Sequence, residues 1–475
     1  MRRRGLGFFG IASFAAMLVT AVKAAEPVRV EPGNGVTFSS DDGSTTLNLG
    51  MYTQFRFQLL DQDQWRRSQF YEVVPPFTVE NVGVTQPSFE VRRFRLFAKG
   101  SLHEPWITYR VEADLAGNDE GLRRVFIPEW QFSSASPSFP QLDIRAGQET
   151  QDNRTVKTLD AYVDLAPRTA AGVRIGAFKV PYGRQELVSD YLLQMTARSI
   201  ASDQFAPSRD RGVMFYGGTP NRVIEWRLGA FNGTGLSEGQ NLDKTLAYAA
   251  RLTATSKGPY LDVESVSDAS VTSGSRIQGG FSWYRSTDTP KRDDPRTPIG
   301  TVDDARFAAD FEMYWKRANV TAEYYTRTIQ VDAVGGLTGR PGIDLPKGCL
   351  GAYLEGRLSC DQQGYYVQAG FLFGPRSELS ARYSKTDNDK ELSSDERSEA
   401  TLNFTRYIKG HALKWSVSAS YFKLGVNAEG SSAFAVKTSK VNSLDMTEFF
   451  LDEAAFPKLD SDRNLLVTAQ LQWAF

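Results

Sequence analysis

Several residue types and patterns that would point to common protein classes are scarce in this chain. After an N-terminal apolar stretch, the 475 residues contain no run of about 18 apolar residues, the length that a membrane-spanning helix needs. Only two histidines and two cysteines are present, and lysine and arginine do not gather into a basic tail. These absences argue against a helical membrane protein, a nucleic-acid-binding protein and a polybasic membrane anchor.

The first 24 residues have the features of an export signal. Three arginines at positions 2–4 precede an apolar run from Leu6 to Val22, and small residues stand where a signal peptidase cleaves, after Ala24. A transmembrane anchor is the alternative, which the shortness of the run and its early glycines disfavour. Without this leader, 51 basic residues face 56 acidic ones, a net charge of about −5. We therefore expect a signal peptide at residues 1–24 and an exported mature chain.

The last eleven residues carry the pattern on which the fold prediction depends. The odd-numbered residues from Leu465 to Phe475 are apolar, whereas the even-numbered ones include Thr468, Gln470 and Gln472. This alternation is expected of a strand with one apolar face and one face in contact with water. A soluble sandwich strand would alternate in the same way. The aromatic residue Phe475 behind Trp473 favours a lipid-facing strand that ends at a membrane interface. Because lipid cannot satisfy backbone groups, such a strand must belong to a closed barrel.

The same alternation recurs along the chain and predicts sixteen strands. This count predicts an all-β fold, a 16-stranded antiparallel transmembrane β-barrel over residues 45–475, preceded by a periplasmic N-terminal segment at 25–44. Residues 125–132 and 142–147 are candidates for an additional hairpin. The predicted strands are 45–60, 89–102, 106–116, 158–166, 172–180, 211–218, 222–231, 245–255, 276–287, 305–316, 318–330, 364–373, 377–386, 398–408, 412–423 and 465–475.

The connections between these strands alternate between short turns and long loops. Outer-membrane barrels have this arrangement, with the short turns in the periplasm. The one exception is Ser256 to Ser275, which is too long for a turn on the expected periplasmic side. An even strand count also places both termini on that side. The protein is therefore expected in the bacterial outer membrane, reached through the periplasm.

The wet faces of the strands supply the candidate functional residues, because a barrel of this width leaves a lumen that its own side chains cannot fill. Twelve cations and eight acids are predicted to point inward, which gives a cationic bias. A basic strip would lower the cost of dehydrating an anion, but the same ions could simply pair across strands and stiffen the wall. The cations are Arg56, Arg93, Arg95, Lys99, Arg110, Arg174, Arg227, Arg251, Arg306, Arg327, Arg382 and Lys414. The acids are Glu112, Asp114, Asp160, Asp164, Glu225, Asp310, Glu312 and Glu323.

The two cysteines, Cys349 and Cys360, lie eleven positions apart in a glycine-rich segment. In an exported chain this spacing indicates a disulfide that closes a loop. A metal site is not expected, because the cysteines have no nearby histidine partners.

Three segments of the chain resemble the phosphate-selective porin O/P family of outer-membrane channels. They are Phe89–Gly100 (FEVRRFRLFAKG), Leu159–Leu165 (LDAYVDL), and Arg174–Glu186 (RIGAFKVPYGRQE) leading to Arg209–Val213 (RDRGV). The resemblance implies a homotrimer of sixteen-stranded barrels, with the third long loop folded inward as a constriction and basic residues that draw anions through.

The resemblance also assigns roles to particular cations. Arg93 and Arg95 are similar to cations of the family's basic track along the barrel wall. Two departures weaken a phosphate assignment, because parity places Lys179 outward unless a bulge at the strand end turns it, and the inward acids would repel phosphate. The cations on or beside the third loop are Lys179, Arg184, Arg198, Arg209 and Arg211.

The predicted function is passive diffusion of small hydrophilic anions such as phosphate. The expected partners are these anions and the lipids of the outer membrane, and no cofactor is expected. A weakly selective porin, or a barrel whose outer loops bind partners, is the alternative. Catalysis is not expected. Paired carboxylates such as Glu112 with Asp114 are what any polar lumen produces, and His103 and His411 both lie in predicted turns.

Overall fold

A computed structural model of the protein describes most of the strands and the shorter connections. The described residues are 29–31, 34–67, 79–116, 128–133, 141–146, 156–168, 171–236, 241, 245–267, 274–288, 301–332, 359–391, 396–424 and 464–475. The signal peptide predicted for residues 1–24 lies outside them. In these ranges no helix is both long and apolar enough to cross a membrane.

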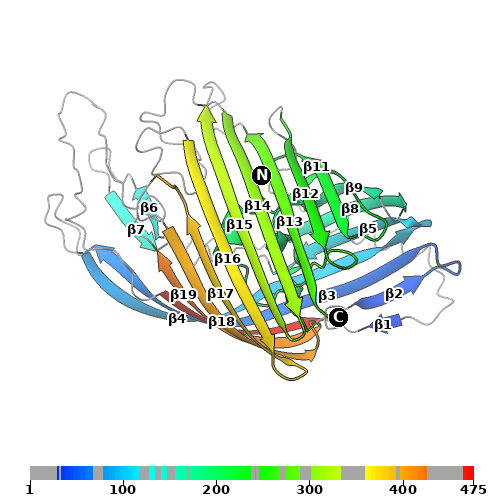
Figure 1. The fold of residues 1–475 in the computed structure, drawn as a ribbon. Coiled ribbons are helices and arrows are strands. Elements are labelled where there is room, and N and C mark those ends of the chain that lie inside the picture. The colour runs from blue at the N-terminus through cyan, green and yellow to red at the C-terminus, as the bar shows by residue number, and fades with distance from the viewer. Residues whose placement is uncertain are drawn as a thin grey trace, which may run out of the picture.

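Sixteen antiparallel strands form a closed barrel (Figure 1), as predicted. The ring closes where β3 (Thr46–Arg67) pairs with both β4 (Val79–Leu102) and the C-terminal β20 (Asn464–Ala474). All sixteen predicted strands are present, and β3 and β4 extend well beyond their predicted bounds. The other strands are β5 (Glu104–Asp114), β8 (Lys157–Arg168), β9 (Ala171–Lys179), β10 (Arg209–Gly218), β11 (Ile224–Phe231), β12 (Ala247–Thr255), β13 (Arg276–Asp288), β14 (Thr301–Trp315), β15 (Ala318–Asp332), β16 (Ser359–Leu372), β17 (Ser377–Asp387), β18 (Glu396–Lys409) and β19 (Leu413–Leu424).

Two small hairpins accompany the barrel. β6 (Pro128–Ser133) and β7 (Gln141–Ala146) pair only with each other, at positions close to those of the candidate additional hairpin. β1 (Arg29–Glu31) pairs with β2 (Gly35–Ser39), and β2 continues onto the first residues of β3, just before β20 takes over the pairing. Figure 1 shows the two hairpins at opposite ends of β4.

The outer face of the barrel is apolar. Exposed residues alternate with buried ones along most of β12 to β20, and β14 exposes Phe307, Phe311 and Trp315 while β20 exposes Leu471 and Trp473. A continuous apolar band would be unfavourable in water. In a membrane it is the surface that contacts lipid.

The connection between β9 and β10, residues 180–208, packs against inward-facing side chains, and we call it the third-loop segment. It contains the short helices α2 (Arg184–Leu187), η2 (Asp190–Leu192) and α3 (Ile200–Phe205). Ser199 begins α3 as its N-cap, because its hydroxyl accepts a hydrogen bond of 3.0 Å from the amide of Ser202.

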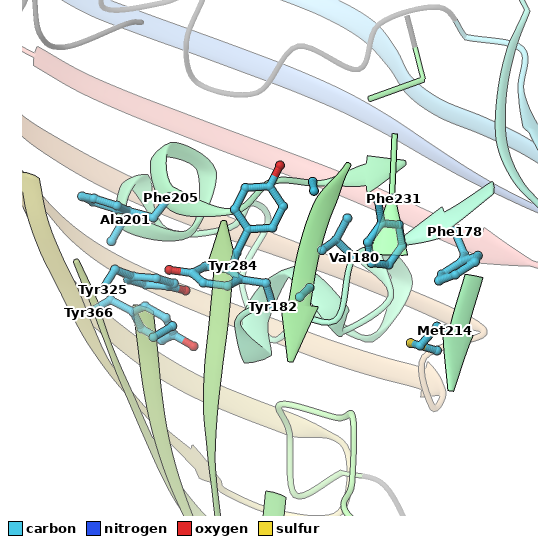
Figure 2. Packing of buried hydrophobic residues seen from close by; sticks show 13 residues of the cluster. Phe178, Val180, Tyr182, Ala201, Phe205, Met214, Phe231, Tyr284, Tyr325 and Tyr366 are labelled. Carbon is cyan, nitrogen blue, oxygen red and sulfur yellow. The ribbon is translucent and has the colours of Figure 1, made fainter. Parts of the chain in front are cut away.

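A buried aromatic cluster joins this segment to the barrel wall (Figure 2). Tyr182 and Phe205 of the segment meet Tyr284, Tyr325 and Tyr366 of β13, β15 and β16. The rings of Phe205 and Tyr325 are stacked, with centroids 5.5 Å apart and an interplanar angle of 11°. Burial of one such side chain contributes about 2 kcal/mol, so the cluster fixes the segment to this side of the wall.

Glycines on the inner face of β16 make room for the third-loop segment. A Cβ on Gly364 would lie 2.6 Å from the ring of Phe205, and one on Gly370 would lie 1.9 Å from the side-chain nitrogen of Gln194. A larger side chain at either position would therefore require the Phe205 ring or the Gln194 side chain to shift.

Candidate functional site

A cavity of about 760 Å³ lies between the third-loop segment and the strands β5 and β8–β11. Aromatic side chains and six cations line it, together with four acids. The cations therefore outnumber the acids by two. They are Arg110, Arg174, Lys179, Arg209, Arg222 and Arg227, and the acids are Glu112, Asp160, Glu225 and Asp262.

Most cations of the cavity are held by neighbouring carboxylates. Arg209 donates to Asp160 over 2.7 Å, and the same carboxylate lies 3.5 Å from Arg110. Arg174 of β9 donates two hydrogen bonds of 2.8 Å, one to each carboxylate oxygen of Asp164 on β8, and its guanidinium lies 4.0 Å from the ring centroid of Tyr162. These contacts fix the orientation of the cations and neutralise part of their charge.

Lys179 differs from the other cations of the cavity. Its ammonium donates to backbone carbonyls of the third-loop segment, including that of Val188 at 3.0 Å. Within the part of the chain that the structure describes, no carboxylate lies within ion-pair distance of Lys179. The outward orientation that parity predicted for Lys179 is wrong, because this last residue of β9 lies where the chain leaves the strand and turns into the segment.

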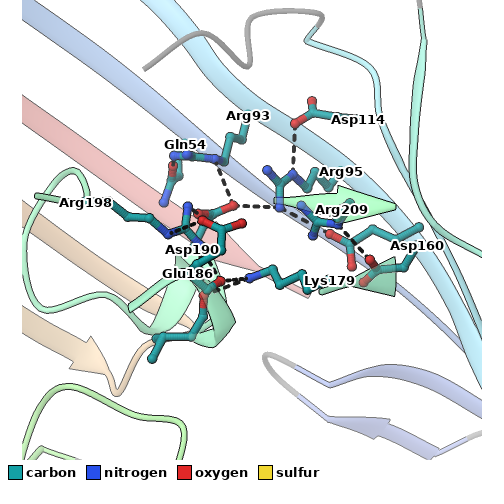
Figure 3. Close-up of polar contacts among 12 residues, drawn as sticks. Gln54, Arg93, Arg95, Asp114, Asp160, Lys179, Glu186, Asp190, Arg198 and Arg209 are labelled. Atoms are coloured by element: carbon teal, nitrogen blue, oxygen red, sulfur yellow. Dashed lines mark hydrogen bonds and ion pairs between the residues drawn. The ribbon is translucent and has the colours of Figure 1, made fainter. Parts of the chain in front are cut away.

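A second charged group joins the wall to the third-loop segment (Figure 3). Asp190 of η2 lies 2.8 Å from Arg95 and 3.2 Å from Arg93, both on β4, and also pairs with Arg198. Arg95 contacts the wall acid Asp114 as well, at 2.9 Å. The cluster is almost completely buried.

The electrostatics of this cluster favour its charged form. Burial alone would raise the pKa of Asp190, but attraction to Arg198, Arg93 and Arg95 outweighs burial and holds the pKa well below its usual range. For the same reason the pKa of Arg198 is raised, because Asp190 and Glu186 outweigh its burial. Asp190 thus supplies a counter-charge to Arg93 and Arg95, the two cations that were expected to attract anions along the wall.

Four predicted inward cations hold the third-loop segment instead of facing open lumen. Each donates to a backbone carbonyl of the segment, and each comes from a different strand. Such charge-assisted bonds satisfy carbonyl groups that would otherwise be buried without partners. The contacts are Arg56 to Thr196, Arg306 to Phe205 (2.8 Å), Arg382 to Ala197 (2.8 Å) and Lys414 to Leu193 (2.7 Å).

Two further inward cations pair across strands. Arg251 lies 2.8 Å from Asp310, and Arg327 lies 2.7 Å from Asp304. These contacts correspond to the alternative in which inward ions stiffen the wall.

The remaining predicted site residues lie away from the cavity. Arg184 is fully buried in an ion pair with Glu312, Arg211 donates to the carbonyls of Gly235 and Leu236, and Lys99 donates to Asn34. Cys360 is buried and disulfide-bonded. Cys349, its predicted partner, lies outside the described residues.

The structure also places residues that the sequence patterns missed. Asp190, Asp262 and Arg222 lie in connections between strands, where the two-residue period carries no information. His411 lies in a turn as predicted, but its ring is buried and contacts the carbonyl of Tyr191. A position in a turn therefore did not keep this ring out of the lumen. In the described ranges, no three His, Cys, Asp or Glu side chains converge so as to hold a metal ion.

Comparisons with known proteins agree with this architecture. The sequence profile of the phosphate-selective porin O and P family matches residues 70–433. An uncharacterized protein of Aquifex aeolicus is 22% identical over 307 residues, which are 59% of this chain and 66% of that protein; the chain thus spans just under two thirds of that relative.

Two solved structures were compared with the chain, and the first of them shares its fold. The anion-selective porin from Comamonas acidovorans has a TM-score of 0.50 at 11% identity, covering 91% of this chain and 100% of that one. A trimer form of in-vitro folded OmpT from Vibrio cholerae has a TM-score of 0.46 at 8% identity, covering 90% and 99%. The family match, which covers more than half of the chain, carries the assignment: the chain belongs to the phosphate-selective porin O and P family, a group of bacterial outer-membrane channel proteins and not of enzymes.

Proposed function

We propose that the protein is an outer-membrane porin through which small hydrophilic anions such as phosphate diffuse passively. The observation that carries the proposal is the cavity beside the third-loop segment, where cations outnumber acids and Lys179 makes no ion pair among the described residues. Fixed cations in a narrow water-filled passage lower the cost of dehydrating an anion.

In this proposal the third-loop segment is the constriction. Support comes from its contacts, because it packs against β13, β15 and β16 through the aromatic cluster and accepts hydrogen bonds from cations on β3, β14, β17 and β19. A segment held from so many strands narrows the passage and leaves the cavity on the side of β5 and β8–β11.

The solute class follows from the charges of the cavity. A phosphate at this site could accept hydrogen bonds from Lys179, by competing with carbonyls of the third-loop segment, and from Arg209 and Arg110, by competing with Asp160. The four carboxylates of the same cavity favour the second candidate, a diffusion porin with weak selectivity. The outer apolar face would contact lipid, and the family resemblance supports a homotrimer.

The test is electrical recording of the purified protein in planar lipid bilayers under a salt gradient. We expect stepwise increases in current as single channels insert, and a reversal potential of the sign that indicates a preference for anions. A cation-leaning potential would contradict anion preference and leave a general porin, and the absence of steps would favour a barrel whose loops bind partners.

Lys179 provides a sharper version of this test. Lys179→Ala should reduce the anion-to-cation permeability ratio and weaken the block of chloride current by phosphate. Lys390→Ala is the matched control, because Lys390 is exposed and lies outside the cavity. Equal ratios for both variants would show that Lys179 does not meet the solute.

A further inference from the structure

The connection between β12 and β13 is longer than the other described turns at its end of the barrel, and a stretch of it is buried. Its residues 259–267, which we call the inserted segment, include Glu264, Ser265 and Val266, all of them inaccessible to solvent. By contrast, Lys316 in the β14–β15 turn at the same end is exposed. A connection of this length at the short-turn end would normally lie in solvent.

Apolar contacts hold the inserted segment against the inner wall. Val263 and Val266 pack with Tyr314 of β14, Leu372 of β16 and Tyr407 of β18. These three strands are not adjacent in the sheet, so the segment extends across the inner face and covers several strands of the barrel.

Polar contacts join the inserted segment to the third-loop segment. The Glu264 carboxylate accepts hydrogen bonds of 2.9 Å from the Gln194 amide and from the Gln185 side chain, both in the third-loop segment. It also accepts a bond of 3.2 Å from Gln368 on the wall, while Ser265 donates to Glu378 over 2.9 Å. The carboxylate would be costly to bury without these partners, so the two segments stabilise each other in place.

Asp262 lies at the boundary between this packed region and the cavity. The next residue, Val263, is buried, whereas the Asp262 side chain is 42% exposed and lines the cavity. Its carboxylate is 4.0 Å from the guanidinium of Arg227 on β11, which is 26% exposed. An exposed pair at this distance is weak, so neither charge is fully neutralised by the other, and both remain accessible from the cavity.

We propose that the inserted segment is the second wall of the conducting path and that Asp262 is a selectivity-determining residue on it. The two segments together fill the side of the lumen lined by β14, β16 and β18, and ions are confined to the side lined by β5 and β8–β11. There Asp262 offsets the charge of Arg227 and limits the preference for anions. This inference rests on the proposed channel function.

The first test measures selectivity. Asp262→Asn leaves the size of the side chain unchanged and removes its charge, and should raise the anion-to-cation permeability ratio about two- to fourfold. Asp41→Asn is the control, because Asp41 is exposed in the β2–β3 turn and lies outside the cavity. An unchanged ratio in Asp262→Asn would overturn the role of Asp262.

The second test locates the path without relying on selectivity. In Asp262→Cys, the new thiol should react quickly with a small water-soluble, negatively charged methanethiosulfonate, and the channel conductance should fall. In Val266→Cys, the thiol should react at least tenfold more slowly. Equal reaction rates would overturn the placement of the inserted segment. Because labelling can be followed in detergent by mass, this result separates failure of the inference from failure of the proposed channel function.

Discussion

The guanidinium of Arg95 on β4 lies 2.8 Å from the carboxylate of Asp190, which the third-loop segment brings to it from 95 residues further along the chain. The contact links the barrel wall to the segment that we propose as the constriction. It also means that a cation which resembles part of an anion track is neutralised by the protein itself. Four of the predictions below follow from contacts of this kind between wall and segment.

Asp190→Asn should loosen the third-loop segment, because the substitution leaves Arg93, Arg95 and Arg198 buried without their shared counter-charge. Removing one partner of a buried pair costs about 3–5 kcal/mol. Hydrogen exchange measured by mass spectrometry should accelerate within residues 180–208 and stay unchanged in the strands far from it. Exchange as slow as in the wild type would show that the cluster does not hold the segment.

The effect of Asp190 should depend on pH in a defined direction. Because its pKa in the folded protein lies well below its usual range, Asp190 contributes stability that is complete above the unfolded pKa of about 4 and is lost as the pH falls through the folded value. The difference in exchange between wild type and Asp190→Asn should therefore be full at neutral pH and shrink in strong acid. A difference that grows on acidification would contradict this assignment.

Arg382→Gln should increase the fluctuations of the third-loop segment without displacing it from the lumen. Arg382 donates to the carbonyls of Ala197 and Arg198, at 2.8 and 3.1 Å, and pairs with Glu399. Loss of these bonds should appear as open-channel flicker in single-channel recordings. Arg285→Gln is a suitable control, because Arg285 is exposed and only weakly paired.

Substitutions at Gly364 and Phe205 should have strongly non-additive effects on the stability of α3. Gly364→Ala places a methyl group 2.6 Å from the Phe205 ring and should displace α3, while Phe205→Ala should cost about 3 kcal/mol of packing. The double variant should be less perturbed than the two single effects together predict, because the smaller side chain leaves room for the methyl group. Additive changes in the exchange of residues 200–205 would show that the two groups do not touch.

A charge on the outer face should destabilise the barrel according to its depth. Leu402 lies in the middle of β18 and is 62% exposed, so Leu402→Arg should cost about 2–4 kcal/mol in folding from urea into lipid vesicles. Ile224, the first residue of β11, lies at a strand end, and Ile224→Arg should cost about 1 kcal/mol or less. Equal costs would contradict a lipid-facing band.

The amino-acid sequence by itself determined the strands, their number and which face of each strand is apolar. These features follow from a local period of two residues, as in β20, where Leu471 and Trp473 face outward and Gln470 and Gln472 face inward. Within the described strands, the period failed where a strand is irregular and where a strand ends. Opposite Gln54 and Phe55 of β3 the register shifts, so that Arg92 is an extra residue of β4 and is buried next to Arg93, and Lys179 at the end of β9 turns inward.

The tertiary structure alone decided what the inward charges do. Arg382 meets Ala197 and Asp190 meets Arg95 across long stretches of sequence, and no local period can specify such partners. The same holds for the inserted segment, whose unusual length was visible in the sequence but whose contacts with Gln185 and Gln194 were not. Strand periodicity reflects the geometry of one chain segment, whereas the charge that an ion would meet depends on which distant segments fill the lumen.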